Sequence, residues 1–104
     1  MKSIVEQWLH EQMPDAGEEL YAEVYGEYKG TANRLLAEME SAIAEKKEFD
    51  VLDKIAHTLK GCAAMVGDQE LFQTVQDWRA ALKEGNGEVC DRLLPTIRNI
   101  ISEL

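Results

Sequence analysis

Apolar residues recur every three or four positions along almost the whole chain, and no segment alternates with the two-residue period of a β-strand. This pattern predicts five helices and no sheet. A short first helix ends near Met13, before Pro14. Four longer helices follow, over about 16–46, 50–66, 68–83 and 88–103.

The longest predicted helix begins at a capping box, in which Asp15 is the N-cap and a glutamate follows three residues later. Gly26 and Gly30 weaken this helix and mark either a close helix contact or a bend. Asp50 is the expected N-cap of the next helix, and Gly67 supplies the left-handed residue that ends it. The apolar stripe of the longest helix consists of Leu20, Val24, Tyr28, Ala32, Leu35, Met39 and Ala42.

Short connections between the four longer helices place sequence neighbours antiparallel. The predicted fold is therefore all-α, an antiparallel up-down-up-down four-helix bundle with a short additional N-terminal helix. A length of 104 residues corresponds to one domain, in which residues 1–14 cap one end of the core and residues 15–104 form the bundle. The turn Gly85-Asn86-Gly87 separates the last two helices, and Pro95 is expected to kink or offset the final one.

Composition limits the classes of function. The formal net charge of −9 argues against binding to nucleic acid, because such binding depends on Lys and Arg neutralising phosphates. No apolar run approaches the ~20 residues that span a bilayer, and the N-terminus lacks the apolar stretch of a signal peptide. We therefore expect a cytoplasmic protein without a membrane segment. Cys62 and Cys90 are expected to be reduced, buried thiols.

His57 is placed on the outer face of the predicted helix 50–66. At about 100° per residue, the apolar residues of this helix fill one sector, which is centred nearly opposite the histidine. Gly61 lies one turn beyond His57, where a glycine costs about 1 kcal/mol relative to alanine. No packing reason for this glycine is evident, so it leaves room for something to approach. The apolar sector consists of Leu52, Ile55, Leu59, Cys62, Ala63 and Val66.

The segment around this histidine resembles the signature of the histidine-containing phosphotransfer (HPt) domain of two-component phosphorelays. That signature is His-x-x-Lys-Gly on a helix, often preceded by alanine, with small residues next and a glycine ten residues after the histidine. Here it reads Ala56-His57-Thr58-Leu59-Lys60-Gly61-Cys62-Ala63-Ala64-Met65-Val66-Gly67, and every signature position matches. The resemblance extends to Leu71 and, more loosely, over about residues 18–103. It implies the same four-helix bundle.

The resemblance also implies a phosphoryl carrier. His57 would accept a phosphoryl group from a phospho-aspartate on the receiver domain of a response regulator or hybrid sensor kinase. It would then pass the group to, or back from, another receiver aspartate. Lys60, one turn beyond, would offer its charge to the phosphoryl oxygens, and Gly61 would let the receiver's loop come close. The chain is expected to need no cofactor of its own, because Mg²⁺ and the acidic pocket belong to the receiver.

Further side chains near the histidine are candidates for contact with the receiver or the phosphoryl group. An exposed apolar patch around Ala64, Met65 and Phe72 is the expected receiver dock. Arg79 and Lys83 occupy positions on the next helix that, in HPt domains, often lie near the histidine. The first of these positions commonly carries an acid or an amide in the family. Arg79 is thus a departure that either adds phosphate stabilisation or alters partner choice.

Asp53, one turn before His57, has two interpretations. It either accepts a hydrogen bond from the imidazole and orients it, or simply favours the helix dipole from the first turn. Together the two side chains offer only two metal ligands where a site needs three or four, so no metal centre is expected. His10 has no Lys-Gly context and is interpreted as an ordinary surface or packing histidine.

A second class of function stays open, in which the bundle is a non-catalytic interaction module whose histidine is never phosphorylated. Autonomous kinase activity is not expected, because the chain has no phosphate-cradling Gly-rich loop. The acidic surface suits a monomer, although HPt-like bundles also pair through helices. The chain begins with Met1 and has no obvious linker, which fits a free-standing protein. An excised piece of a hybrid kinase would look similar.

Overall fold

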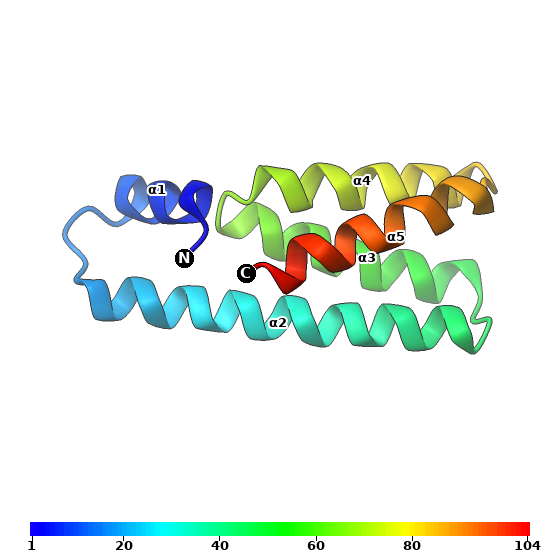
Figure 1. Ribbon diagram of the computed structural model, residues 1–104, viewed down its shortest axis with the longest axis horizontal. Coiled ribbons are helices and arrows are strands. Elements are labelled where there is room, and N and C mark those ends of the chain that lie inside the picture. The colour runs from blue at the N-terminus through cyan, green and yellow to red at the C-terminus, as the bar shows by residue number, and fades with distance from the viewer.

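Five α-helices and no strand make up the computed structural model, which describes residues 1–104. The helices are α1 (Ser3–Gln12), α2 (Glu18–Ala44), α3 (Phe49–Met65), α4 (Gln69–Lys83) and α5 (Gly87–Ser102). From α2 to α5 they run alternately in opposite directions, and each packs against the next (Figure 1). α2 also contacts α5, which closes the bundle. The predicted all-α, four-helix bundle with a short additional N-terminal helix is confirmed.

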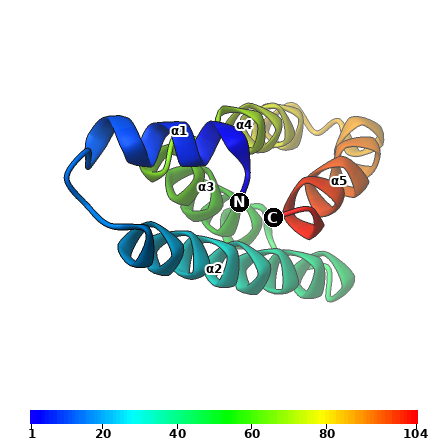
Figure 2. The ribbon, with the colours of Figure 1, turned by 60° about the vertical axis from the view of Figure 1, so that its left-hand side comes forward.

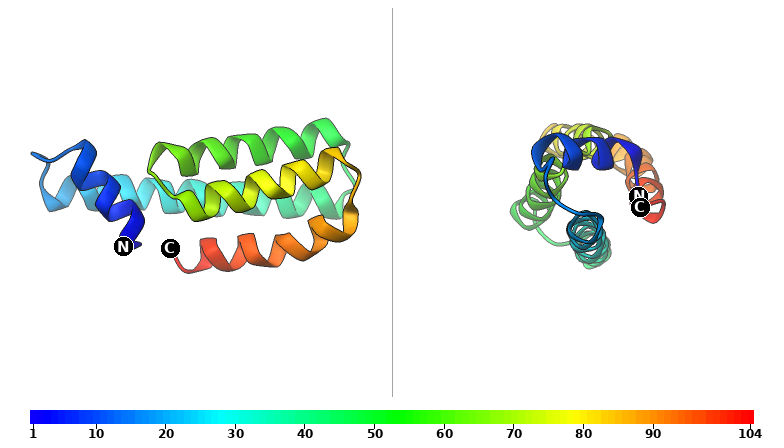
Figure 3. Two further views of the ribbon diagram at one scale, coloured as in Figure 1. Left: turned by 90° about the horizontal axis from the view of Figure 1, so that it is seen from above. Right: turned by 90° about the vertical axis from the view of Figure 1, so that its left-hand side faces the viewer.

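α1 covers the end of the bundle at which α2 projects beyond the other helices (Figures 1 and 3). α2 has 27 residues and spans most of the longest dimension of the molecule, which measures 45 × 21 × 20 Å. The two chain termini lie close together at this end (Figure 2). None of the five helices combines the length and the apolar character needed to cross a membrane.

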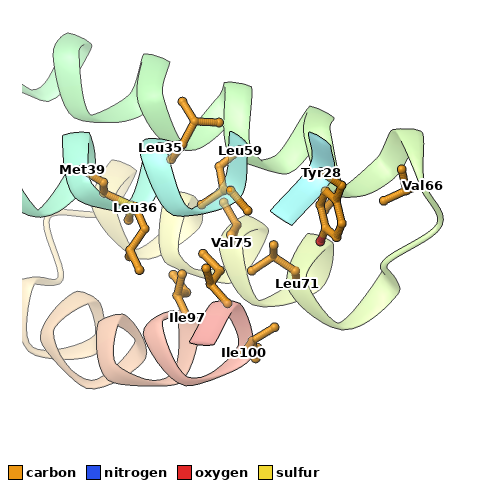
Figure 4. Packing of buried hydrophobic residues seen from close by; sticks show 14 of the residues in the cluster. Tyr28, Leu35, Leu36, Met39, Leu59, Val66, Leu71, Val75, Ile97 and Ile100 are labelled. Carbon is orange, nitrogen blue, oxygen red and sulfur yellow. The ribbon is translucent and has the colours of Figure 1, made fainter. Parts of the chain in front are cut away.

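The helices of the bundle share one apolar core. Figure 4 shows side chains from α2, α3, α4 and α5 converging between the helices. Fully burying a leucine-sized side chain is worth about 1.5–3 kcal/mol relative to leaving it exposed, so this cluster is the main source of stability. α1 adds Val5 and Leu9, which are fully buried. The core side chains labelled in Figure 4 are Tyr28, Leu35, Leu36, Met39, Leu59, Val66, Leu71, Val75, Ile97 and Ile100.

The predicted apolar stripe of α2 is wrong at its first residue. Leu20 is 42% exposed, whereas the neighbouring Tyr21 is only 2% exposed. In this projecting part of α2 the buried side is set by α1 and the chain termini and not by the bundle. The hydroxyl of Tyr21 donates to the Met13 carbonyl just after α1, and that of Tyr25 donates to the Leu104 carbonyl. Tyrosine suits this place because its long side chain satisfies backbone carbonyls at the end of the core.

Two predicted N-caps lie elsewhere. α2 begins at Glu18 after Gly17, so Asp15 precedes the helix and does not cap it. α3 begins at Phe49, which places Asp50 inside its first turn. An acidic residue is favourable both at the N-cap and in the first turn, because both positions lie at the positive end of the helix dipole. An acidic residue in the sequence therefore locates the start of a helix only to within about one turn.

The predictions for three glycines have different outcomes. A Cβ atom at Gly26 or Gly30 would have no neighbour within 4 Å, so neither glycine marks the close helix contact considered above. Gly67 has a φ of +69° and ends α3, as predicted. A Cβ there would also come within 2.4 Å of the Trp8 side chain on α1. Gly67 is therefore required both by its backbone conformation and by the close packing of α1.

A buried carboxylate joins three helices next to this glycine. Asp68 is fully buried, and its Oδ1 accepts from Lys2 Nζ at 2.8 Å and from the Leu71 backbone N–H at 3.3 Å, which caps α4. Its Oδ2 accepts from the Tyr28 hydroxyl of α2 at 2.5 Å. Lys2 Nζ also lies 2.9 Å from Glu70 Oε1. Every oxygen of the buried carboxylate thus has a partner, as a charge in an apolar interior requires.

The protonation states of this cluster follow from its geometry. Burial works against the charge on Lys2, but the hydrogen bonds and negative charges of Asp68 and Glu70 outweigh it and raise the pKa of the ammonium. Burial, together with the neighbouring Asp68 carboxylate, raises the pKa of Tyr28, so its hydroxyl stays protonated and donates. The hydrogen bonds of this cluster therefore persist at neutral pH and join α1, α2 and α4.

Asp68→Ala is expected to lower the free energy of unfolding by about 2–4 kcal/mol, because it leaves Lys2 and Tyr28 without a buried partner and removes the cap of α4. Urea unfolding followed by circular dichroism measures the loss. Glu70→Ala removes the other, 62% exposed partner of Lys2 and is expected to cost less than about 1 kcal/mol. Equal losses in the two variants would contradict a dominant role for the buried carboxylate.

Candidate functional site

His57 lies in the middle of α3 with its side chain exposed to solvent, as the periodicity predicts. The buried face of the same helix is formed by Ala56, Leu59 and Ala63, which pack into the core. The core thus fixes the rotation of α3 about its axis. As a result the imidazole is presented to solvent from a rigid helix.

A groove of about 620 Å³ runs between α2 and α3 beside His57. The space over Gly61 is open, because a Cβ at that position would meet nothing within 4 Å. Met65 stands at its edge with 75% of its surface exposed, the largest exposure of any large apolar side chain in the protein. The groove is lined by Val24, Glu27, Tyr28 and Thr31 from α2, and by His57, Thr58, Gly61, Cys62, Met65 and Val66 from α3.

The floor of the groove is uncharged. Tyr28 and Val66 are buried there, and Cys62 is half-buried. Burial raises the pKa of the Cys62 thiol, with a smaller opposing influence from the positive charge of Arg34. The thiol therefore stays protonated at neutral pH. Both cysteines of the chain are free thiols, but of the two only Cys90 is buried as predicted.

On the other side of His57, α3 and α4 are joined by an ion pair. Arg79 donates from Nε to Asp53 Oδ1 at 2.9 Å and from an Nη atom to Oδ2 at 3.3 Å. This hydrogen bonding is the largest influence that lowers the pKa of the Asp53 carboxyl, and the nearby charges of Arg79, Lys83 and His57 act in the same direction. Partial burial is the second-largest influence on this pKa and acts in the opposite direction. Of the two interpretations of Asp53, the hydrogen bond to His57 is not found, and both carboxylate oxygens accept from Arg79 instead.

Lys60 lies one turn beyond His57, as expected, and is partly exposed. Its ammonium is 5.5 Å from the centre of the Phe72 ring on α4, within the range of a cation–π interaction. Phe72 is itself packed against the core, so its ring is a firm support for the lysine chain. The charge of Lys60 is held on the α4 side of the histidine, opposite the groove.

The predicted apolar patch is divided between two sides of α3. Met65 belongs to the groove with α2. Ala64 and Phe72 line a separate hollow of about 160 Å³ between α3 and α4, together with Gly67, Asp68 and Gln69. Lys83 is exposed near the end of α4. Of the predicted site residues, only Gly61 and Met65 share the groove with His57.

Sequence reasoning missed the contribution of α2. Val24, Glu27 and Thr31 form the second wall of the groove, although Val24 was assigned to the core and the other two to no site. Their spacing of three and four residues places them on one face of a helix. That face borders the apolar stripe on the side that turns towards α3. Nothing in the sequence alone states which flank of the stripe lies beside the histidine.

No group of three or more His, Cys, Asp or Glu side chains is placed to hold a metal ion. The ring of His10 lies against that of Tyr21, with the ring centres 4.4 Å apart and the planes tilted by 47°, which agrees with its interpretation as a surface or packing histidine. What the site offers chemically is an exposed imidazole, a groove with an uncharged floor on one side of it, and Lys60, Lys83 and the Asp53–Arg79 ion pair on the other. Imidazole nitrogen is a good nucleophile, and cations near it favour an anionic reaction partner.

Comparison with known families gives one match. The model of the family described as "Hpt domain" matches residues 23–104, which include α3 with its histidine and the whole of α4 and α5. No curated protein and no solved structure was found to match the chain. The family match covers more than three quarters of the sequence and agrees with the helical bundle. The chain belongs to the family of Hpt domains, which carry out histidine phosphotransfer in two-component systems.

Proposed function

We propose that this chain carries phosphoryl groups between receiver domains, with His57 as the phosphoryl acceptor. The observation that carries the proposal is the exposed imidazole of His57 within the complete His-x-x-Lys-Gly motif, beside an open groove. Membership of the family supports histidine phosphotransfer in general. The assignment of the reaction to His57, and the roles given to its neighbours, belong to the proposal.

In the proposed reaction a ring nitrogen of His57 attacks the phosphorus of a receiver phospho-aspartate in line with the bond to be broken. The nitrogen–phosphorus bond forms, the acyl–phosphate oxygen–phosphorus bond breaks, and the aspartate leaves as a carboxylate. The proton on the other ring nitrogen passes to solvent. The reverse sequence delivers the group to a second receiver. Such transfers need mainly positioning and charge stabilisation, which a small bundle can provide.

Lys60 supplies a mobile positive charge in this proposal. Its ammonium rests over Phe72 on the α4 side of the histidine, and its flexible chain can move from there towards phosphoryl oxygens. Lys83 adds a further charge on α4. Magnesium and the acidic pocket come from the receiver, so the chain needs no cofactor of its own.

The groove between α2 and α3 is the receiver dock in this proposal. Gly61 and the apolar floor allow close approach to the histidine, and Met65 is an exposed apolar side chain that a partner can cover. Glu27 and Thr31 give the dock a polar rim. A contact of this kind buries a modest area, as transient signalling contacts do. We place the protein in the cytoplasm as a monomer, in keeping with its acidic surface.

His57→Gln is expected to abolish phosphorylation by a receiver. Intact-mass spectrometry is performed after incubation with Mg²⁺ and a receiver domain that is kept phosphorylated by a small-molecule donor. The wild type and the control variant His10→Gln each gain a single acid-labile phosphoryl group, and His57→Gln gains none. Phosphorylation of His57→Gln would contradict the assignment. If several receivers failed to phosphorylate the wild type, a non-catalytic interaction module would be the better explanation.

Lys60→Ala is expected to slow transfer from the receiver by about tenfold, because it removes one charge-assisted contact to the phosphoryl group. Rapid-quench measurements of the receiver-to-histidine step give the rate. The control Lys29→Ala removes an exposed lysine of α2 that lies outside the groove, and this variant should transfer at the wild-type rate. The free energy of unfolding of both variants should lie within about 0.5 kcal/mol of the wild-type value. An unchanged rate in Lys60→Ala would show that its charge is not used.

Gly61→Gln is expected to block receiver docking without damaging the fold. A Cβ at this position meets nothing within 4 Å, and the helix should gain up to about 1 kcal/mol from the loss of the glycine. Transfer from the receiver should fall by more than about tenfold, whereas phosphorylation of His57 by the small donor phosphoramidate should be unaffected. Gly26→Gln, at an open position of α2 outside the groove, is the matched control. Normal transfer in Gly61→Gln would remove the steric argument.

A further inference from the structure

The ion pair between Asp53 and Arg79 borders the exposed histidine. Asp53 lies one helical turn before His57 on α3, and Arg79 reaches it from α4 with two hydrogen bonds. The two side chains are only 23% and 15% exposed, so water screens their mutual attraction less than it screens a surface pair. The carboxylate therefore stays ionised and bound to the guanidinium at neutral pH.

The two members of this pair have opposite effects on a phosphoryl group attached to His57. The carboxylate would repel the negative charge of the group, and the guanidinium would attract it. While the two are bound to each other, their fields largely cancel at the histidine. Four other charged side chains lie around the histidine, and none of them forms an ion pair. These four side chains are Lys54 and Lys60 on α3, Glu27 on α2 and Lys83 on α4.

We propose that Arg79 is a positioning residue that acts on His57 through Asp53. By binding both carboxylate oxygens, Arg79 prevents Asp53 from turning to the imidazole and neutralises a charge that would oppose phosphorylation. Asp53 in turn keeps the guanidinium from binding the phosphoryl group directly. The ion pair thus sets how readily His57 takes and keeps a phosphoryl group. The biological meaning of this balance rests on the proposed phosphotransfer, but the balance itself belongs to the isolated chain.

A purely structural role predicts a different pattern of mutational effects. If the pair only held α3 against α4, loss of either partner would disturb the site in the same direction. If the pair balances charge at the histidine, loss of Asp53 frees a cation and loss of Arg79 frees an anion. The effects on His57 phosphorylation then have opposite signs. The direction of the two effects therefore separates the explanations.

The experiment uses phosphoramidate, which needs no receiver. A ring nitrogen of His57 forms a bond to phosphorus while the phosphorus–nitrogen bond of phosphoramidate breaks. Ammonia leaves and takes up the proton that the imidazole loses from its other nitrogen, so phosphohistidine and ammonium are the products. Intact-mass spectrometry at successive times gives the rate for the full chain and its variants.

Asp53→Asn should raise the rate roughly threefold to tenfold, and Arg79→Gln should lower it by a similar factor, the size expected for one charge a helical turn away. The double variant should lie between the two single variants. Arg79→Lys keeps the charge and should recover most of the wild-type rate. The exposed pair of Glu40 and Arg98 provides controls for net charge, and Glu40→Gln and Arg98→Gln should leave the rate unchanged.

A shift of both single variants in the same direction, or no shift beyond that of the controls, would overturn the inference. The proposed function fails separately, if receivers do not phosphorylate the wild type. In that case opposite effects with phosphoramidate would still establish the charge balance at His57. If receivers phosphorylate His57 and the opposite effects are missing, only the role of Arg79 is lost.

Discussion

The buried carboxylate of Asp68 is the contact on which the arrangement of this protein depends. A charge in an apolar interior must be paired, and here Lys2 before α1, Tyr28 on α2 and the first turn of α4 all supply partners. The neighbouring Gly67 ends α3 and receives Trp8 of α1. The turn between α3 and α4 thereby joins the end of α3 to α1 and α2. The apolar core then determines which side of α3 faces water.

The site contains few functional side chains, which suits histidine phosphotransfer because that reaction needs mainly positioning and charge. His57 is exposed on a helix whose opposite face is buried in the core, so its imidazole is presented from a fixed backbone position. On one side of it the groove with α2 has an uncharged floor, and on the other side the Lys60 ammonium lies over Phe72 of α4. In the proposed function a receiver approaches over the groove, and Lys60 balances negative charge from the α4 side. Arg79 of α4 is bound to Asp53, so an anion also lies on this side of the histidine.

Local patterns predicted the helices and the exposure of His57, because both depend on the 3.6-residue period of a single helix. Contacts between distant segments were not predictable in the same way. The helical period could not show that Tyr21 is buried and Leu20 exposed, because the position of α1 determines which side of this part of α2 is covered. Asp68 was expected only to start a helix, and its burial depends on Lys2 and Tyr28. Likewise, the partner of Asp53 and the α2 wall of the groove follow from how the helices pack.

In the proposed function, His57 receives a phosphoryl group from one receiver and delivers it to another. The most direct measurement is a pulse-chase with a purified receiver that carries radiolabelled phospho-aspartate, followed by addition of a second, unlabelled receiver. The label should leave the first receiver, appear on this chain in an acid-labile form, and then appear on the second receiver. If the label is released only as inorganic phosphate, and never resides on this chain, the account is contradicted.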